Sequence, residues 1–270
     1  MGCLVLGVVR GKELPFLVLA PGRRILQFSV LHEVPAPEFY GEVVGFLERH
    51  GAKLLGGYTQ LVEGKLEHTY FIDVTEGVRD LEETIQHLSR LPKVLKFKVF
   101  SVSEGIAVDD AHFPLTSRRG RRMIVFSAEI FSQALAKLYE LFSSGAALIL
   151  YEVGQKHGQE MASALKTMAE EAGVLLKPAQ LIDLTLRYLQ SCGWAIFHLK
   201  IASEAPLEAE VQAEELFEPM ARFGKGFGCD LFRGELAGIF NTAYDKKVKV
   251  QEIACVAKGA PICTFKIAER

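Results

Sequence analysis

Residues 251–265 read QEIACVAKGAPICTF and hold two of the five cysteines of the chain, with a glutamate three positions before the first. Together with an upstream cysteine they form the series Cys229-x22-Glu252-x2-Cys255-x7-Cys263. Zinc binds four ligands tetrahedrally, prefers thiolates and accepts a carboxylate, and a site with four protein ligands is structural. Spacing alone leaves two interpretations open, which are a structural zinc site and ordinary buried thiols beside an exposed glutamate.

The segments around these residues predict how the four side chains could meet. VKVQEIACV and ICTFKIA indicate two closing strands, and CDLFRGELAGIFNTAY before them indicates a helix that begins near Cys229. Residues three apart on a straight strand point to opposite faces of the sheet. We therefore expect a bulge or turn at Ala254 to Cys255, because without it Glu252 and Cys255 could not face the same ion.

The rest of the C-terminal half predicts an α+β domain over residues 123–270. Its helices are indicated by capping residues and by apolar positions at helical spacing, and its further strand by β-branched and aromatic residues. The expected elements are a helix capped by Ser127, a helix over residues 145–173, a helix opened by Pro178 and ended by Gly193, a strand over residues 194–203 and an acidic helix over residues 208–224.

The N-terminal half predicts the order β-α-β-β-α-β after a short hairpin. Two βαβ halves joined by a hairpin fold into one antiparallel sheet with two helices on one face, which is the ferredoxin-like arrangement. The expected elements are hairpin strands at 3–9 and 15–20, followed by strand 25–34, helix 37–51, strand 53–62, strand 68–76, helix 80–92 with Asp80 as its cap and Pro92 as its stop, and strand 94–102. The chain as a whole is therefore expected to be α+β.

The segment from Ser101 to Arg122 loses this periodicity and gathers turn-forming and charged residues. We expect a first domain at 1–105, a linker at 106–122 and the second domain from residue 123. Four arginines in the linker could contact phosphates, but a solvated linker is the simpler interpretation of so few charges without interleaved aromatic residues. They are Arg118, Arg119, Arg121 and Arg122.

Composition excludes several function classes. The formal net charge is −2 and charged residues make up 24% of the chain, so nucleic acid and anionic membranes are not expected partners. The apolar start has no positively charged region and breaks at Arg10, so neither a signal peptide nor a membrane span is predicted. An odd number of cysteines without an export signal favours reduced thiols and a cytoplasmic protein. Dinucleotide-binding, Walker, HExxH and Gly-x-Ser-x-Gly patterns are missing, so the sequence gives no evidence for catalysis.

The C-terminal pattern resembles that of the 4-vinyl reductase domain family. In that family a cysteine, a Gly-x3-Gly helix, Glu-x2-Cys-x3-Gly and a final Cys-x-Phe close the domain, and the resemblance extends upstream through KIASEAP and LILYEVGQKHGQEMA. The matching positions are Cys229, Gly234, Gly238, Glu252, Cys255, Gly259, Cys263 and Phe265. Members include the sensory domains of phenol-responsive transcription activators, so the resemblance implies a structural zinc bound by the three cysteines and Glu252.

The same resemblance implies an α/β domain that forms dimers and encloses an apolar cavity, similar in fold to transport tethering subunits. Aromatic and soft apolar residues with a few polar atoms line such cavities, although each of them could equally be packed in the core. The candidate ligand-binding residues are Tyr188, Trp194, Phe197, Phe217, Met220, Phe240 and Tyr244.

The N-terminal unit resembles the ACT family of regulatory domains, which bind amino acids near the first strand-to-helix loop. Ala36 stands in this loop where a glycine would let the backbone approach a ligand, so a generic dimerisation module is an equal alternative. We expect a non-enzymatic, homodimeric regulatory protein that senses a hydrophobic small molecule and acts through a protein effector. The alternatives are an enzyme or assembly factor for a tetrapyrrole-like substrate and a structural adaptor related to transport tethering subunits.

Overall fold

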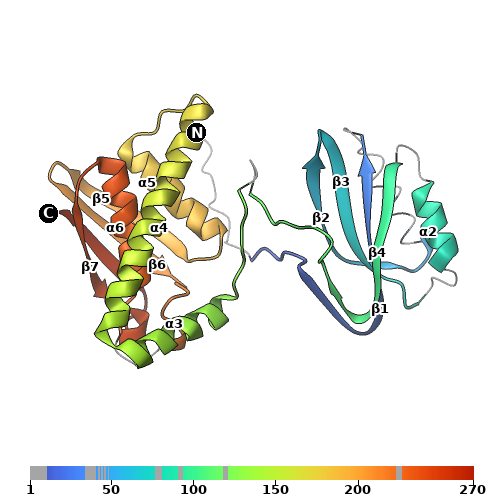
Figure 1. Cartoon of the computed structure of the whole chain (residues 1–270), viewed down its shortest axis with the longest axis horizontal. Coiled ribbons are helices and arrows are strands. Elements are labelled where there is room, and N and C mark those ends of the chain that lie inside the picture. Colours follow the sequence, from blue (N-terminus) through green and yellow to red (C-terminus); the bar gives the residue numbers. More distant parts are fainter. Residues whose placement is uncertain are drawn as a thin grey trace, which may run out of the picture. The chain divides into compact units, whose positions relative to one another are not determined.

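In the computed structural model the chain divides into two compact units, Met1–Met123 and Ile124–Arg270 (Figure 1). The structure describes residues 11–33, alternate residues of 41–49, 50–76, 81–90, 94–117, 121–222 and 227–270. The predictions for strand 3–9, Ala36, Asp80, Pro92, Arg118 and Arg119 fall outside the described residues. Of the helices in the described ranges, none combines the length and the apolar character that crossing a membrane requires.

The N-terminal unit is an antiparallel four-stranded sheet with the strand order β2-β3-β1-β4. Alternate residues from 41 to 49 are helical between β1 and β2, and helix α2 lies between β3 and β4. The bounds are β1 Leu17–His32, β2 Lys53–Val62, β3 Lys65–Asp73, α2 Leu81–Ser89 and β4 Val94–Val108. The ferredoxin-like assignment of this unit stays a prediction.

One long strand replaces two predicted ones in this unit. Strand β1 covers both the expected hairpin strand at 15–20 and the strand from residue 25, with a register shift between Leu19 and Arg24. Its first residues pair with the end of β4, where Leu17 lies opposite Val108. Strand β4 therefore continues past Gly105, where the sequence pattern indicated the end of the first domain.

The two faces of this sheet differ in polarity. Alternate β1 residues such as Phe28 and Val30 pack with Ile72 and with Leu88 of α2 in an apolar core. Because neighbouring residues of a strand face opposite sides, Gln27 and its alternate neighbours lie on the other face. That second face carries buried polar side chains.

The C-terminal unit contains helices and a second antiparallel sheet of order β5-β6-β8-β7 (Figure 1). Ser127 accepts a hydrogen bond from the backbone of Ile130, Pro178 begins α5, and Gly193 follows its end with φ of 86°, so these three boundary predictions are confirmed. The bounds are α3 Ala128–Phe142, α4 Ser144–Glu171, α5 Pro178–Ser191, β5 Ile196–Glu204, β6 Leu207–Glu214, α6 Asp230–Tyr244, β7 Val248–Ala254 and β8 Cys263–Glu269, with short 3-10 turns at Met220–Arg222 and Val256–Lys258.

The acidic helix predicted at residues 208–224 is wrong. Its first half belongs to β6, which pairs with β5 and with β8. Leu207 and Val211 are buried while Glu208 is exposed, so the period of the sequence is two rather than 3.6. The helix-forming tendency of Glu and Ala is overridden because pairing on both edges buries one face of the strand.

Helices α4 and α6 cross in direct backbone contact. Each contributes two glycines four residues apart, and a Cβ on any of them would overlap the backbone of the other helix. Gly234 lies against Tyr151, and Gly158 lies against Glu235. The crossing therefore fixes the position of α6, whose first turn follows Cys229.

Candidate metal centre and neighbouring networks

Three of the four predicted metal ligands meet in the C-terminal unit. Cys229 precedes α6, Cys255 follows β7 and Cys263 begins β8, and all three are buried. Their Sγ atoms are 3.5 Å apart for Cys229 and Cys255, 3.8 Å for Cys229 and Cys263, and 3.9 Å for Cys255 and Cys263. The spacing of the thiols therefore allows all three to contact one ion.

This spacing fits zinc. Thiolates bound to tetrahedral zinc at about 2.3 Å lie about 3.8 Å from one another, which is close to the three measured separations. Among the described residues this is the group of His, Cys, Asp and Glu whose ligand atoms all lie within 4.8 Å. Three sulfur atoms in one buried place form a donor set that suits zinc rather than calcium or magnesium.

The predicted break in β7 is present. Its pairing with β8 shifts between Glu252 and Ala254, and the strand ends at Ala254. A 3-10 turn follows, and Gly259 adopts a left-handed conformation with φ of 89° that a side chain would strain. The turn directs Cys255 and Cys263 toward the start of α6.

Glu252 lies beside the thiols but outside the group of three. One carboxylate oxygen accepts a hydrogen bond from the backbone amide of Cys229 at 2.8 Å, and the other accepts one from Lys258 Nζ at 2.7 Å. Gly228 permits this approach, because a Cβ there would lie 2.7 Å from Glu252 Oε2. The fourth predicted ligand thus contacts the backbone of the first in this structure.

Hydrogen bonds also polarise the thiols. The backbone amide of Val256 donates to Cys263 Sγ at 3.4 Å. Hydrogen bonds from the thiols of Cys229 and Cys255 lower the pKa of Cys263 to about 4, while the pKa of Cys229 is raised by its interactions with the same two cysteines. The cluster therefore favours a thiolate at Cys263, and metals bind thiolates rather than thiols.

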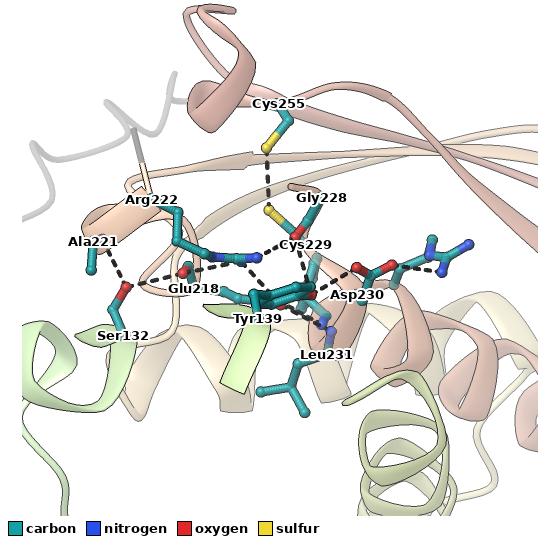
Figure 2. A network of polar contacts seen from close by, with 12 residues as sticks. Ser132, Tyr139, Glu218, Ala221, Arg222, Gly228, Cys229, Asp230, Leu231 and Cys255 are labelled. Carbon is teal, nitrogen blue, oxygen red and sulfur yellow. Dashed lines mark hydrogen bonds and ion pairs between the residues drawn. The ribbon is translucent and has the colours of Figure 1, made fainter. Parts of the chain in front are cut away.

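A buried ion pair supports the start of α6 (Figure 2). Glu218 is fully buried and accepts hydrogen bonds from the amides of Leu231 and Phe232 at 3.0 and 2.8 Å, which belong to the first turn of α6. Arg222 Nη2 lies 3.3 Å from Glu218 Oε1, and its Nη1 donates to Gly228 O at 2.8 Å. Burial raises the pKa of Glu218 to about 7.

Further contacts tie this pair to α3. The Arg222 guanidinium lies 4.4 Å from the centre of the Tyr139 ring, and the Tyr139 hydroxyl donates to Asp230 Oδ2 at 2.7 Å. Ser132 donates from Oγ to Glu218 O at 3.0 Å and accepts from the amide of Ala221 at 2.9 Å. Figure 2 shows this network next to the Cys229–Cys255 contact. Residues from α3 and from the 218–222 segment therefore hold the backbone that carries Cys229.

Sequence reasoning missed this network. Glu218 and Arg222 fell in the segment predicted as an exposed acidic helix, where their charges were expected to be solvated. The available signal was the run ELFEPMARF, in which an acid and a base four residues apart stand among large apolar residues. A pair of opposite charges inside an apolar run favours a buried ion pair over a solvated face.

Three of the candidate ligand-binding residues lie in one aromatic cluster, which we define as Trp194, Phe197, Phe217 and Phe232. Trp194 meets Phe217 edge-on at 5.2 Å between ring centroids, and Phe197 stacks on Phe232 at 5.2 Å. Trp194 and Phe232 are 6.5 Å apart. Trp194 and Phe197 are only partly buried, so this cluster reaches toward the surface.

The other four candidates lie elsewhere. Phe240 is fully buried in the core of the unit, and Met220 is 49% exposed at the 3-10 turn. Tyr188 on α5 and Tyr244 at the end of α6 are partly buried.

A polar pair adjoins the aromatic cluster and was not anticipated. Glu235 of α6 is fully buried, and its Oε2 lies 2.7 Å from His157 Nδ1 of α4. Its Oε1 is buried without a hydrogen-bond partner in the described part of the chain. His157, whose side chain is 44% exposed, stacks on Trp194 at 5.5 Å. The hydrogen bond to Glu235 raises the pKa of His157, and burial raises the pKa of Glu235.

Comparisons with known proteins place these features in context. The structure is similar to the phenol-responsive sensory domain of the transcription activator PoxR with phenol (16% identity, 57% of this chain and 83% of that chain, TM-score 0.47). It is similar to a trafficking protein particle complex subunit 3 from Naegleria fowleri covalently bound to palmitic acid (10% identity, 53% and 95%, TM-score 0.42). A third likeness is to a vinyl-4-reductase family protein from Methanocaldococcus jannaschii (16% identity, 55% and 99%, TM-score 0.31).

No curated protein sequence matches this chain. The model of one protein family, that of the vinyl-4-reductase domain, does match over residues 210–269. This range contains α6, the terminal hairpin, all three clustered cysteines and Glu252. The family prediction made from the cysteine and glycine pattern is confirmed for this range: the C-terminal unit carries a vinyl-4-reductase domain.

Proposed function

We propose that the C-terminal unit is a non-enzymatic sensory domain that binds a hydrophobic or aromatic small molecule. The aromatic cluster carries this proposal, because it joins partly buried rings to a half-exposed imidazole at one place. Binding sites for small apolar molecules combine large apolar area with a few polar groups that fix orientation. The family match over residues 210–269 supports the same interpretation.

In this proposal the ligand packs against Trp194, Phe197 and Phe217, and the His157–Glu235 pair supplies the polar contact. Rings stack at about 4.5–7 Å with an energy beyond simple area burial, so an aromatic ligand would extend the existing stack. A buried carboxylate oxygen without a partner is costly, and a ligand that donates to Glu235 Oε1 would relieve that cost.

A zinc ion held by Cys229, Cys255 and Cys263 completes the proposal as a structural element. Bound zinc would supply no chemistry beyond joining the start of α6 to the β7–β8 hairpin. Glu252 is the proposed fourth ligand, and it would exchange its hydrogen bond with the Cys229 amide for the metal. The proposal includes a homodimer and a protein effector that reads the ligand-bound state.

Trp194 provides a direct test, since it is the only tryptophan of the chain and lies in the proposed site. Phenol, palmitate and protoporphyrin IX would be titrated while Trp194 fluorescence and the melting temperature are recorded. We expect a saturable fluorescence change and a higher melting temperature with at least one of them, because a ligand at a hundred times its Kd adds about 2.7 kcal/mol. The Trp194→Phe variant should lose the signal but keep the thermal shift.

Two outcomes would contradict the proposal. No saturable change with any compound would favour the structural adaptor. Turnover of a tetrapyrrole in the presence of a reduced nicotinamide would favour the enzyme.

A further inference from the structure

The second face of the N-terminal sheet carries an ordered set of polar side chains. Leu31 of β1 lies opposite Glu67 of β3 on one side and opposite Lys96 of β4 on the other. In the next row Ser29 lies opposite Lys98. Because residues two apart on a strand share a face, these side chains point away from the apolar core that α2 covers (Figure 1).

A cavity of about 160 Å³ opens on this face. Its walls combine two ammonium groups with one carboxylate, one imidazole and two apolar side chains. The residues that matter for the argument are Leu31, Glu67, Lys96, Lys98, Phe100 and His112.

The carboxylates at the cavity already have donors. Glu67 accepts from Ser29 Oγ at 3.3 Å and from Gln60 Nε2 at 2.7 Å, one bond on each oxygen. Asp109, beside His112, accepts from Gln27 Nε2 at 2.9 Å and from the Tyr58 hydroxyl at 2.6 Å. Neither carboxylate therefore needs a lysine to satisfy it.

The two lysines, by contrast, have no carboxylate partner among the described residues. Lys98 Nζ lies 4.7 Å from the centre of the Phe100 ring, and Lys96 lies two residues before Lys98 on the same strand. Two like charges on one strand face repel each other unless an anion lies between them. The cavity thus presents positive charge whose neighbouring acids are already satisfied.

Asp109 shows what this face accommodates. Its carboxylate belongs to the segment after β4 and lies against the same face, where it binds Gln27, Tyr58 and His112 Nδ1, the last at 2.7 Å. The side chain of Asp109 is only 8% exposed. A carboxylate can therefore be desolvated here by side-chain donors of the sheet.

We propose that this cavity binds a small organic anion with an apolar body. The anionic group lies between the ammonium groups of Lys96 and Lys98, within reach of the Ser29 hydroxyl. The body packs against Leu31 and Phe100. This site is independent of the aromatic cluster in the C-terminal unit and would give the protein a second input.

The test is calorimetric titration of the full chain with benzoate, benzamide and inorganic phosphate. Benzoate should bind saturably and more weakly as salt concentration rises, because the contact is between charges. Benzamide, which has the same shape without the charge, should bind at least about tenfold more weakly. Inorganic phosphate, which has charge without an apolar body, should also bind at least about tenfold more weakly.

Variants assign the binding to this cavity. Lys96→Gln and Lys98→Gln should each weaken benzoate binding severalfold, whereas Lys65→Gln, an exposed lysine at the start of β3, should not. Three results would overturn the proposal: no saturable benzoate binding, equal binding of benzamide, or benzoate binding that persists in both lysine variants. Benzoate bound at the C-terminal unit instead would change Trp194 fluorescence and would survive both substitutions.

Discussion

Cys229 Sγ lies 3.5 Å from Cys255 Sγ, although 26 residues separate them in the chain. Cys263 completes the triangle at 3.8 and 3.9 Å. The three sulfur atoms come from a helix start, a turn and a strand start, so a bound ion would join three elements that the hydrophobic core alone holds together.

Purified protein should therefore contain about one zinc per chain. A strong chelator should lower the melting temperature, and Cys255→Ser should cost at least about 3 kcal/mol because a structural metal contributes its binding energy to folding. Cys192→Ser is the matched control, since that cysteine is exposed and lies outside the cluster. Metal-free protein with an unchanged melting temperature would exclude a structural zinc site.

Glu218→Ala should be among the most destabilising substitutions in the C-terminal unit. It leaves Arg222 buried without its partner and frees two amides of α6, and breaking one side of a buried pair costs about 3–5 kcal/mol. Glu208→Gln on the exposed face of β6 should change stability by less than about 0.5 kcal/mol. Urea unfolding would measure both, and equal small effects would mean that the pair adds nothing to the fold.

The two networks differ in how readable they are from the sequence. The metal set could be predicted because thiols and a carboxylate at fixed spacing have few uses, and the break in β7 followed from the two-residue period of a strand. Glu218 could not be placed, because its role depends on amides of α6 that lie 13 and 14 residues further along the chain. Contacts that tertiary folding alone creates leave no local pattern.

The misread strand β6 has a related cause. Its Glu and Ala residues favour a helix locally, yet Leu207, Ala209, Val211 and Ala213 are buried in alternation. Pairing with β5 and β8 decides the outcome, and neither partner is visible within a short window. The aromatic cluster was found in part because large rings are expected near binding sites, while His157 and Glu235 looked like ordinary residues of surface helices.

The N-terminal unit should lose stability in mild acid. Burial, and then the nearby charge of His32, lower the pKa of His68 to about 4, whereas an unfolded chain titrates near 6.5. Between these values the unfolded state binds more protons, so stability falls as pH drops from about 6.5 to about 4. His68→Gln should flatten this dependence in urea unfolding. Identical pH slopes for both proteins would show that His68 is not responsible.

The pKa of His157 should lie above 6.5, because Glu235 accepts its hydrogen bond and stabilises the imidazolium. Glu235→Gln should lower that pKa, as followed by the NMR signals of the ring. The contribution of the pair to stability should be present below the unfolded value and decline as pH rises through the folded one. His198, which is exposed, serves as the internal reference in the same spectra.

Gly238→Ala tests the crossing of α4 and α6. Its Cβ would overlap Gln155 O and lie 2.6 Å from the amide nitrogen of Gln159, so the helices must separate, and overpacking of this kind costs about 1–3 kcal/mol. Gly145→Ala is the matched control, because its Cβ would meet Phe142 Cβ at an ordinary 3.8 Å and alanine favours a helix by up to about 1 kcal/mol. The two variants should therefore shift stability in opposite directions. A gain from both would mean that the helices can part without loss, and the rigid placement of Glu235 beside Trp194 would no longer follow from the glycines.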